Sequence, residues 1–158
     1  MTKNQEADKK IIELHDDVGN DAVMTMLKHL YGLNYKEQYF DEEDDVTVEM
    51  HHALFILGDK YDISSLREEA AASFDEFLAR ESRDRDYYSS TIFTIQKLLG
   101  PHAPQLVDKS LEDTARSFVL DDYTFLFRDE LFRSLIAEGT MFQKDLAMEF
   151  LGIIYNDL

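Results

Sequence analysis

The sequence has no cysteine, which excludes disulfide bonds, thiolate nucleophiles and zinc sites with cysteine ligands. It is also poor in glycine and proline, with six and two of these residues in 158. So few glycines leave little scope for a loop that closes around a phosphate group, and no glycine-rich phosphate loop is present. No Gly-x-Ser-x-Gly motif marks a serine nucleophile. The sequence therefore lacks the usual signatures of nucleotide-binding and hydrolytic sites.

Basic residues are scarce as well. The chain has 16 Lys and Arg but 33 Asp and Glu, which gives a formal net charge of −17. This charge repels phosphate backbones and anionic lipid headgroups, so we expect neither nucleic acid nor a membrane as a partner. No apolar run is long enough for a membrane-spanning helix, and residues 1–14 lack the apolar stretch of a signal peptide. We expect an intracellular protein, either cytoplasmic or nuclear.

The chain does contain apolar residues in a helical pattern. Hydrophobic residues make up 44% of the sequence and include eleven Phe and eight Tyr, which supply the area for a core. Apolar stripes at helical spacing occur in seven segments, residues 23–31, 46–61, 66–78, 92–99, 106–119, 127–136 and 142–154. Residues 10–14, KIIEL, are a strand candidate. The pattern predicts a mainly α-helical fold with at least six helices and at most one or two short strands.

Several polar residues and one glycine are candidate helix ends. Asp17 or Asn20 has the position of an N-cap for the first predicted helix, and Gly32 has the position of its stop. Ser65 and Glu68 have the spacing of a capping box at the third predicted helix. Residues 34–45, NYKEQYFDEEDD, are predicted to form a polar, acidic connection between the first and second helices.

A charged segment without an apolar stripe interrupts the helical pattern at residues 79–86, ARESRDRD. We interpret it as a boundary inside the chain. The predicted parts are residues 1–80 and residues 81–158.

The histidines are the remaining candidates for chemistry. They are His15, His29, His51, His52 and His102. Glu49 and His52 have the Glu-x-x-His spacing of di-iron helical bundles, but no second Glu-x-x-His occurs. The acidic run at residues 41–45, DEEDD, lacks the glycine of a calcium loop. We predict that the protein is not an enzyme and has no metal or cofactor; the alternative is a metal-dependent helical enzyme centred on Glu49 and His52.

Two ordered motifs give the chain a family resemblance. His29-Leu30-Tyr31-Gly32 ends the first predicted helix, and Gly58-Asp59-Lys60-Tyr61-Asp62-Ile63 joins the second to the third. With their flanking helices they resemble the C-terminal half of a BTB/POZ domain of the type common in fungal proteins. The resemblance spans residues 6–78, a little under half of the chain. Residues 88–158 resemble the helical tail of such proteins in pattern alone.

The resemblance implies an architectural signature with no reacting group. The signature residues are Tyr31, Asp59, Tyr61 and Ile63. Tyr61 would cover the joint between two helices and hydrogen-bond through its hydroxyl, and Ile63 would fill the core beneath the turn. Asp59 would support the turn or the N-terminus of the next helix. The family presents surfaces to other proteins, so the implied function is a protein–protein interaction module, such as an adaptor in a ubiquitin-ligase or transcriptional complex.

A cullin scaffold is one partner that the resemblance implies. Family members that recruit cullins often carry a hydrophobic-x-Glu motif just before the last strand of the domain. The corresponding residues are Asn4, Gln5 and Glu6. Glu6 matches as a protein-binding residue, whereas Asn4 replaces the hydrophobic anchor. We expect a protein partner, with cullin binding weakened at Asn4.

The N-terminal half of a BTB/POZ domain, with most of its strands and its usual dimer surface, has no counterpart in the chain. This predicts that the apolar residues which would contact that half are exposed. They are Val23, Leu27, Leu30, Leu54 and Leu57. Exposed apolar patches promote association, so we expect self-association or dependence on a partner. A non-functional truncated fragment is the remaining alternative.

Overall fold

The computed structural model of the protein describes residues 18–33, 47–84 and 89–156. These residues form seven α-helices and no strand. The helices are α1 (Asn20–Leu30), α2 (Val48–Lys60), α3 (Ser64–Asp84), α4 (Ser89–Leu99), α5 (Ser110–Leu126), α6 (Glu130–Ala137) and α7 (Lys144–Asn156). The prediction of a mainly α-helical fold is confirmed. The strand candidate at residues 10–14 lies outside the described residues, as do Asn4 and Glu6.

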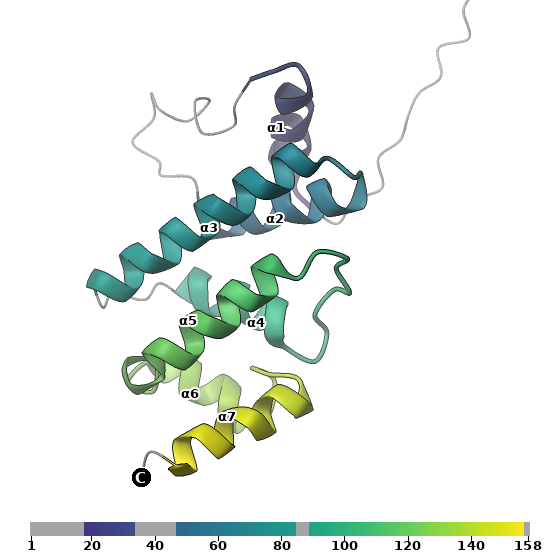
Figure 1. The fold of residues 1–158 in the computed structure, drawn as a ribbon. Coiled ribbons are helices and arrows are strands. Elements are labelled where there is room, and N and C mark those ends of the chain that lie inside the picture. Colours follow the sequence, from purple (N-terminus) through teal and green to yellow (C-terminus); the bar gives the residue numbers. More distant parts are fainter. Residues whose placement is uncertain (1–17, 34–46, 85–88, 157–158) are drawn as a thin grey trace, which may run out of the picture.

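The helices form an elongated stack, with α1 at one end and α7 at the other (Figure 1). The most extensive contact joins α2 to α3; α1 packs on α2, and α4 contacts both α5 and α6. Contacts of α2 with α4 and of α3 with α5 connect the first three helices to the rest. Helix α3 also continues through residues 79–84, most of the charged segment between the two predicted parts. The division near residue 80 stays a prediction.

Helix α2 lies in the middle of the first half of the stack, because α1, α3 and α4 all pack on it. Contact on several sides widens the buried face beyond the apolar stripe that the sequence predicts. Phe55, His51 and His52 are therefore buried together with the stripe residues Leu54 and Leu57. A stripe read from the sequence underestimates burial when a helix has neighbours all around it.

The surface predicted to be exposed is only partly exposed. Leu54 and Leu57 are fully buried because the neighbouring helices cover α2, so this part of the prediction is wrong. Val23 and Leu27 are half-buried against the core, and Leu30 at the end of α1 is 56% exposed. Of the five residues predicted to be exposed, the described helices thus bury Leu54 and Leu57 fully and Val23 and Leu27 in part.

The structure agrees with the predicted C-terminal end of α1 but not with Asn20 as its N-cap. Gly19 is the N-cap of α1, and as a glycine it offers no side-chain cap. Asn20 is the first helical residue and is therefore not the N-cap. Asp17 lies outside the described residues. Gly32 does follow the end of α1, with a φ of +83° that favours glycine.

Side-chain caps occur at α2 and α6. Thr47 Oγ1 accepts a hydrogen bond from the Met50 N–H at 3.4 Å, and Asp129 Oδ1 accepts one from Phe132 at 2.9 Å. At α3 the helix already begins at Ser64, so Ser65 is not its N-cap and the predicted capping box is wrong. The Ser65 hydroxyl instead hydrogen-bonds the ring of His29 in α1 at 2.9 Å.

An aromatic cluster holds α7 against α5 and α6. The ring of Phe142 lies 5.2 Å from Phe150 and 6.2 Å from Phe132, and the Phe132 ring lies 5.6 Å from Phe127. Tyr123 of α5 meets Phe150 edge to face at 6.1 Å. These contacts fix the inner face of α7 on the stack.

Candidate functional site

The turn between α2 and α3 contains the predicted signature and forms a Schellman C-cap. Tyr61 is the C-cap residue, and the Ile63 N–H donates to the Gly58 carbonyl at 2.8 Å. Asp62 between them has a left-handed φ of +53°, in the position where glycine is most common. Tyr61 and Ile63 are half-buried against the core. The hydrogen bond of the Tyr61 hydroxyl stays a prediction.

Gly58 marks a close approach of α2 to α3. A Cβ atom added to Gly58 would lie 2.9 Å from the backbone nitrogen of Arg67 and 3.1 Å from its Cα. Backbone atoms at this distance cannot rotate away as a flexible side chain can. The absence of a side chain at Gly58 therefore sets how closely the two helices pack.

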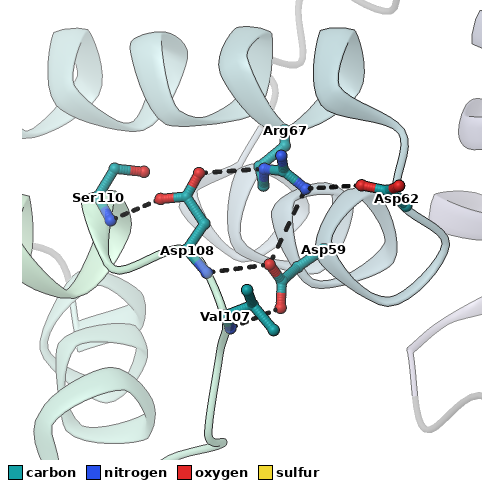
Figure 2. Close-up of polar contacts among 6 residues, drawn as sticks. All are labelled: Asp59, Asp62, Arg67, Val107, Asp108 and Ser110. Atoms are coloured by element: carbon teal, nitrogen blue, oxygen red, sulfur yellow. Dashed lines mark hydrogen bonds and ion pairs between the residues drawn. The ribbon is translucent and has the colours of Figure 1, made fainter.

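Asp59 holds a segment that lies far away in the sequence. Figure 2 shows its carboxylate beside the segment that leads into α5. One oxygen accepts a hydrogen bond from the Val107 N–H at 3.0 Å and the other accepts one from the Asp108 N–H at 3.1 Å. This contact with the segment before α5 is additional to the predicted role of Asp59 at its own turn or at the N-terminus of α3, which stays a prediction.

Arg67 completes this network from the first turns of α3 (Figure 2). Its Nε lies 3.0 Å from Asp108 Oδ2, and its Nη1 lies 4.0 Å from Asp59 and 3.9 Å from Asp62. Asp108 Oδ1 also accepts a hydrogen bond from the Ser110 N–H at 2.9 Å, at the start of α5. Hydrogen bonds from Ser110, and then the charge of Arg67, lower the pKa of Asp108. The network joins the ends of three helices and has the character of a structural joint.

Tyr31, the other signature residue, lies on the surface. Its side chain is 88% exposed. Helix α1 ends at Leu30 and the chain turns at Gly32, so Tyr31 follows the last helical residue. Its role as a signature residue stays a prediction. Exposed beside Tyr31 are Met24, Leu30 and Leu33, so the end of α1 presents apolar side chains to the surface.

The residues considered for a di-iron site lie on α2. His51 and His52 are buried, and Glu49 is half-buried. The His51 ring packs edge to face on Phe77 of α3 at 6.3 Å, which is a helix-packing contact. Within the described ranges, no three His, Asp or Glu side chains are placed to hold a metal ion together. The structure thus brings no further described ligand to the Glu49–His52 pair.

His52 is the residue of this group with the most unusual environment. Burial, and then the positive charge of Lys97, lower the pKa of His52 from 6.5 to about 4. Its Nε2 is buried and has no hydrogen-bond partner among the described residues. The ring is therefore neutral at neutral pH. It lines a cavity of about 420 Å³ between α2, α4 and the connection after α4.

The outer face of α7 is the second apolar surface of the molecule. Met148, Leu151 and Tyr155 are 63%, 58% and 81% exposed. Their spacing of three and four residues places them on one side of the helix. On the inner side, Phe150 is buried and Leu146 packs against the core.

Several of these features were not predicted from the sequence as functional or structural sites. Gly58 matters because of a backbone 9 residues further on, and Arg67 and Asp108 carry no motif of their own. A partial signal existed for Asp108, because an Asp two residues before Ser110 at a helix start is typical of a local side-chain-to-backbone hydrogen bond. The outer stripe of α7 is readable as helical spacing, but its exposure is not.

A comparison of the chain with family models, with curated proteins and with solved structures finds no match. None of the described helices combines the length and the apolar composition needed to cross a membrane. The candidate sites are therefore assessed from their own geometry: a structural joint at Asp59, a cavity at His52, and apolar surfaces on α1 and α7.

Proposed function

We propose that the protein is a protein–protein interaction module and that the outer face of α7 binds its partner. The observation that carries this proposal is the stripe of Met148, Leu151 and Tyr155, each more than half exposed. Contiguous exposed apolar side chains are unfavourable in water, and they commonly mark surfaces that a partner covers. Tyrosine and methionine are also enriched at such interfaces.

The inner face of α7 supports this proposal because it holds the helix rigidly. Phe150 and Phe142 are buried, and Arg116 of α5 forms an ion pair with Glu149 on α7. A face presented by a helix that is already folded costs little ordering entropy on binding. Anchors at i, i+3 and i+7 fit an apolar face of a partner helix.

The charge of the chain defines the chemistry of the partner. A net charge of −17 favours a partner with basic residues around its apolar contact surface. Asp145 supplies an acidic group in the first turn of α7 itself. We therefore propose a partner segment with an apolar helical face and flanking Lys or Arg residues.

The BTB/POZ resemblance remains part of this proposal as an expectation from the sequence. It suggests an adaptor, with a cullin scaffold as one partner through Glu6. Binding through α7 does not depend on that resemblance, because it uses residues outside the two BTB-like motifs.

The proposal is tested by combining Met148→Ser, Leu151→Ser and Tyr155→Ser in one variant. The matched control combines Phe93→Ser and Val107→Ser, which change exposed apolar residues elsewhere. Both variants should melt like the wild type, since all five side chains are exposed. Each immobilised protein is incubated with extract from the source cells, and bound proteins are quantified.

We expect a partner that the wild type and the control retain and the α7 variant loses. With that partner purified, the α7 variant should bind at least about tenfold more weakly, as expected for the loss of anchor residues. If the α7 variant retains every captured protein as well as the wild type, α7 is not the binding face.

A further inference from the structure

The cavity at His52 has the size of a small-molecule site. Its volume is about 420 Å³, within the range of roughly 300–1,000 Å³ typical of ligand pockets. It lies between α2, α4, the segment that follows Leu99, and Thr140. It is separate from the stripe on α7 and from the Asp59 joint, so its role is independent of the proposed function.

The lining of this cavity combines apolar walls with a few polar groups. Ile56, Pro101 and Pro104 supply apolar surface. Lys97 supplies a positive charge and has no ion-pair partner in the described part of the chain. His52 contributes part of its ring to the wall, while its Nε2 atom is itself buried and has no hydrogen-bond partner among the described residues.

The charge of this lining is opposite to that of the molecule as a whole. Among the residues that line the cavity there is no Asp or Glu, although the chain has 33 of them. The other cavity of similar volume, about 410 Å³ between α3 and α5, is lined by four aspartates: Asp75, Asp113, Asp121 and Asp122. Lys97 is exposed, and the polar side chains of Gln96, His102 and Thr140 line the cavity as well. A lysine beside apolar surface, with no acidic group in the lining, favours a ligand that carries a negative charge.

We propose that this cavity binds a small monocarboxylate with an apolar body. The carboxylate would form an ion pair with the Lys97 ammonium, beside the ring of His52 in the cavity wall. The apolar body would lie against Ile56 and the two prolines.

A monocarboxylate fits better than a phosphate group. Phosphate sites in proteins use several arginine or lysine side chains or a helix N-terminus with free amides. Here the wall contains a single lysine and no arginine, and none of the lining residues lies in the first turn of a helix. One negative charge and an apolar body match one lysine and apolar walls.

The experiment uses 4-phenylbutanoate as the probe with the full chain labelled with ¹⁵N and with ¹³C in the histidine rings. NMR titration should shift the ring signal of His52 and the amide signals of residues 97–102 in a saturable way. We expect a Kd of about 1 mM or tighter, as is usual for a ligand of this size. The neutral amide 4-phenylbutanamide should bind at least about tenfold more weakly.

Two variants of Lys97 and one control variant test whether the charge of Lys97 binds the probe. Lys97→Glu should weaken binding of 4-phenylbutanoate at least about tenfold, and Lys28→Glu, the same charge change on exposed α1, should leave it unchanged. Lys97→Met keeps the chain length without the charge, and it serves if the glutamate variant folds poorly. Equal melting temperatures of the wild type and the variants exclude a folding defect.

Three outcomes would overturn the proposal. One is no shift of the His52 ring up to about 10 mM probe, a concentration that would reveal even weak binding. Another is equal binding of the amide, which would leave no role for the charge. The third is equal or tighter binding of inorganic phosphate at the same signals, which would identify a general anion site with no need for an apolar body.

Discussion

At the scale of single residues, His52 connects the stability of the fold to pH. The unfolded chain binds a proton at this ring near the ordinary pKa of 6.5, whereas the folded protein binds it only near about 4. Between these values the unfolded state holds more protons, so the free energy of unfolding decreases as the pH falls. The stabilisation is fully present above the unfolded pKa and is lost on acidification. The full shift corresponds to roughly 3 kcal/mol.

We expect the variant His52→Gln to have a flatter pH profile than the wild type. Glutamine does not titrate, so the loss of stability between about pH 7 and about pH 4.5 should shrink by roughly 2–3 kcal/mol. Urea denaturation at several pH values measures this difference. His102→Gln, at an exposed histidine, is the control and should keep the wild-type profile. Identical profiles for His52→Gln and the wild type would show that His52 does not titrate in this way.

At the scale of helices, the pairing of α2 with α3 depends on a missing side chain. Gly58 has the lowest helix propensity of the non-proline residues, yet it stands inside α2 because the Arg67 backbone lies too close for a Cβ atom. The close packing of α2 on α3 that glycine allows offsets the free energy that its low helix propensity costs.

We expect Gly58→Ala to destabilise the protein by about 1–3 kcal/mol, the usual cost of overpacking, even though alanine favours helix. The matched control is Gly152→Ala in α7, where a Cβ atom meets nothing within 4 Å. That variant should gain up to about 1 kcal/mol from helix propensity alone. Chemical denaturation measures both. A stabilised Gly58→Ala would mean that α2 and α3 are less close than described.

The helices themselves could be predicted from the sequence, because each has an apolar face and the 3.6-residue period reports that face directly. Leu54 and Leu57 were predicted to be exposed and are buried, because exposure depends on which neighbouring helices cover a helix. The hydrogen-bond partners of Asp59 could not be predicted from the sequence, because they too depend on the tertiary arrangement. Its two hydrogen bonds join residues 48 and 49 positions apart, and no local pattern encodes such a contact. The spacing of Glu49 and His52 was readable, but the cavity beside His52 requires α4 and the segment after it.

At the scale of the whole molecule, a continuous core determines how the stack unfolds. The buried apolar residues form one cluster from Ala22 in α1 to Phe150 in α7. The contacts of α2 with α4 and of α3 with α5 lie across the predicted boundary near residue 80. Elements that share a core usually lose it together.

We therefore expect one cooperative thermal transition for the full chain, with equal calorimetric and van't Hoff enthalpies. Differential scanning calorimetry measures both quantities. Circular dichroism should follow the same transition and show a helical spectrum. Two separate transitions would instead support two independent parts, residues 1–80 and 81–158.

The carboxylate of Asp59 also bears on the order of events during folding. Helices α2 and α3 can pair once the short turn at Tyr61, Asp62 and Ile63 has formed. The hydrogen bonds of Asp59 form only when amide groups 48 and 49 residues further along the chain reach its carboxylate. Contacts between distant residues form more slowly because a longer loop must close first. We expect the helix pair to form early and the Asp59 contacts to close after the transition state. Interactions made that late slow unfolding without accelerating folding, so this joint would contribute to the lifetime of the folded state.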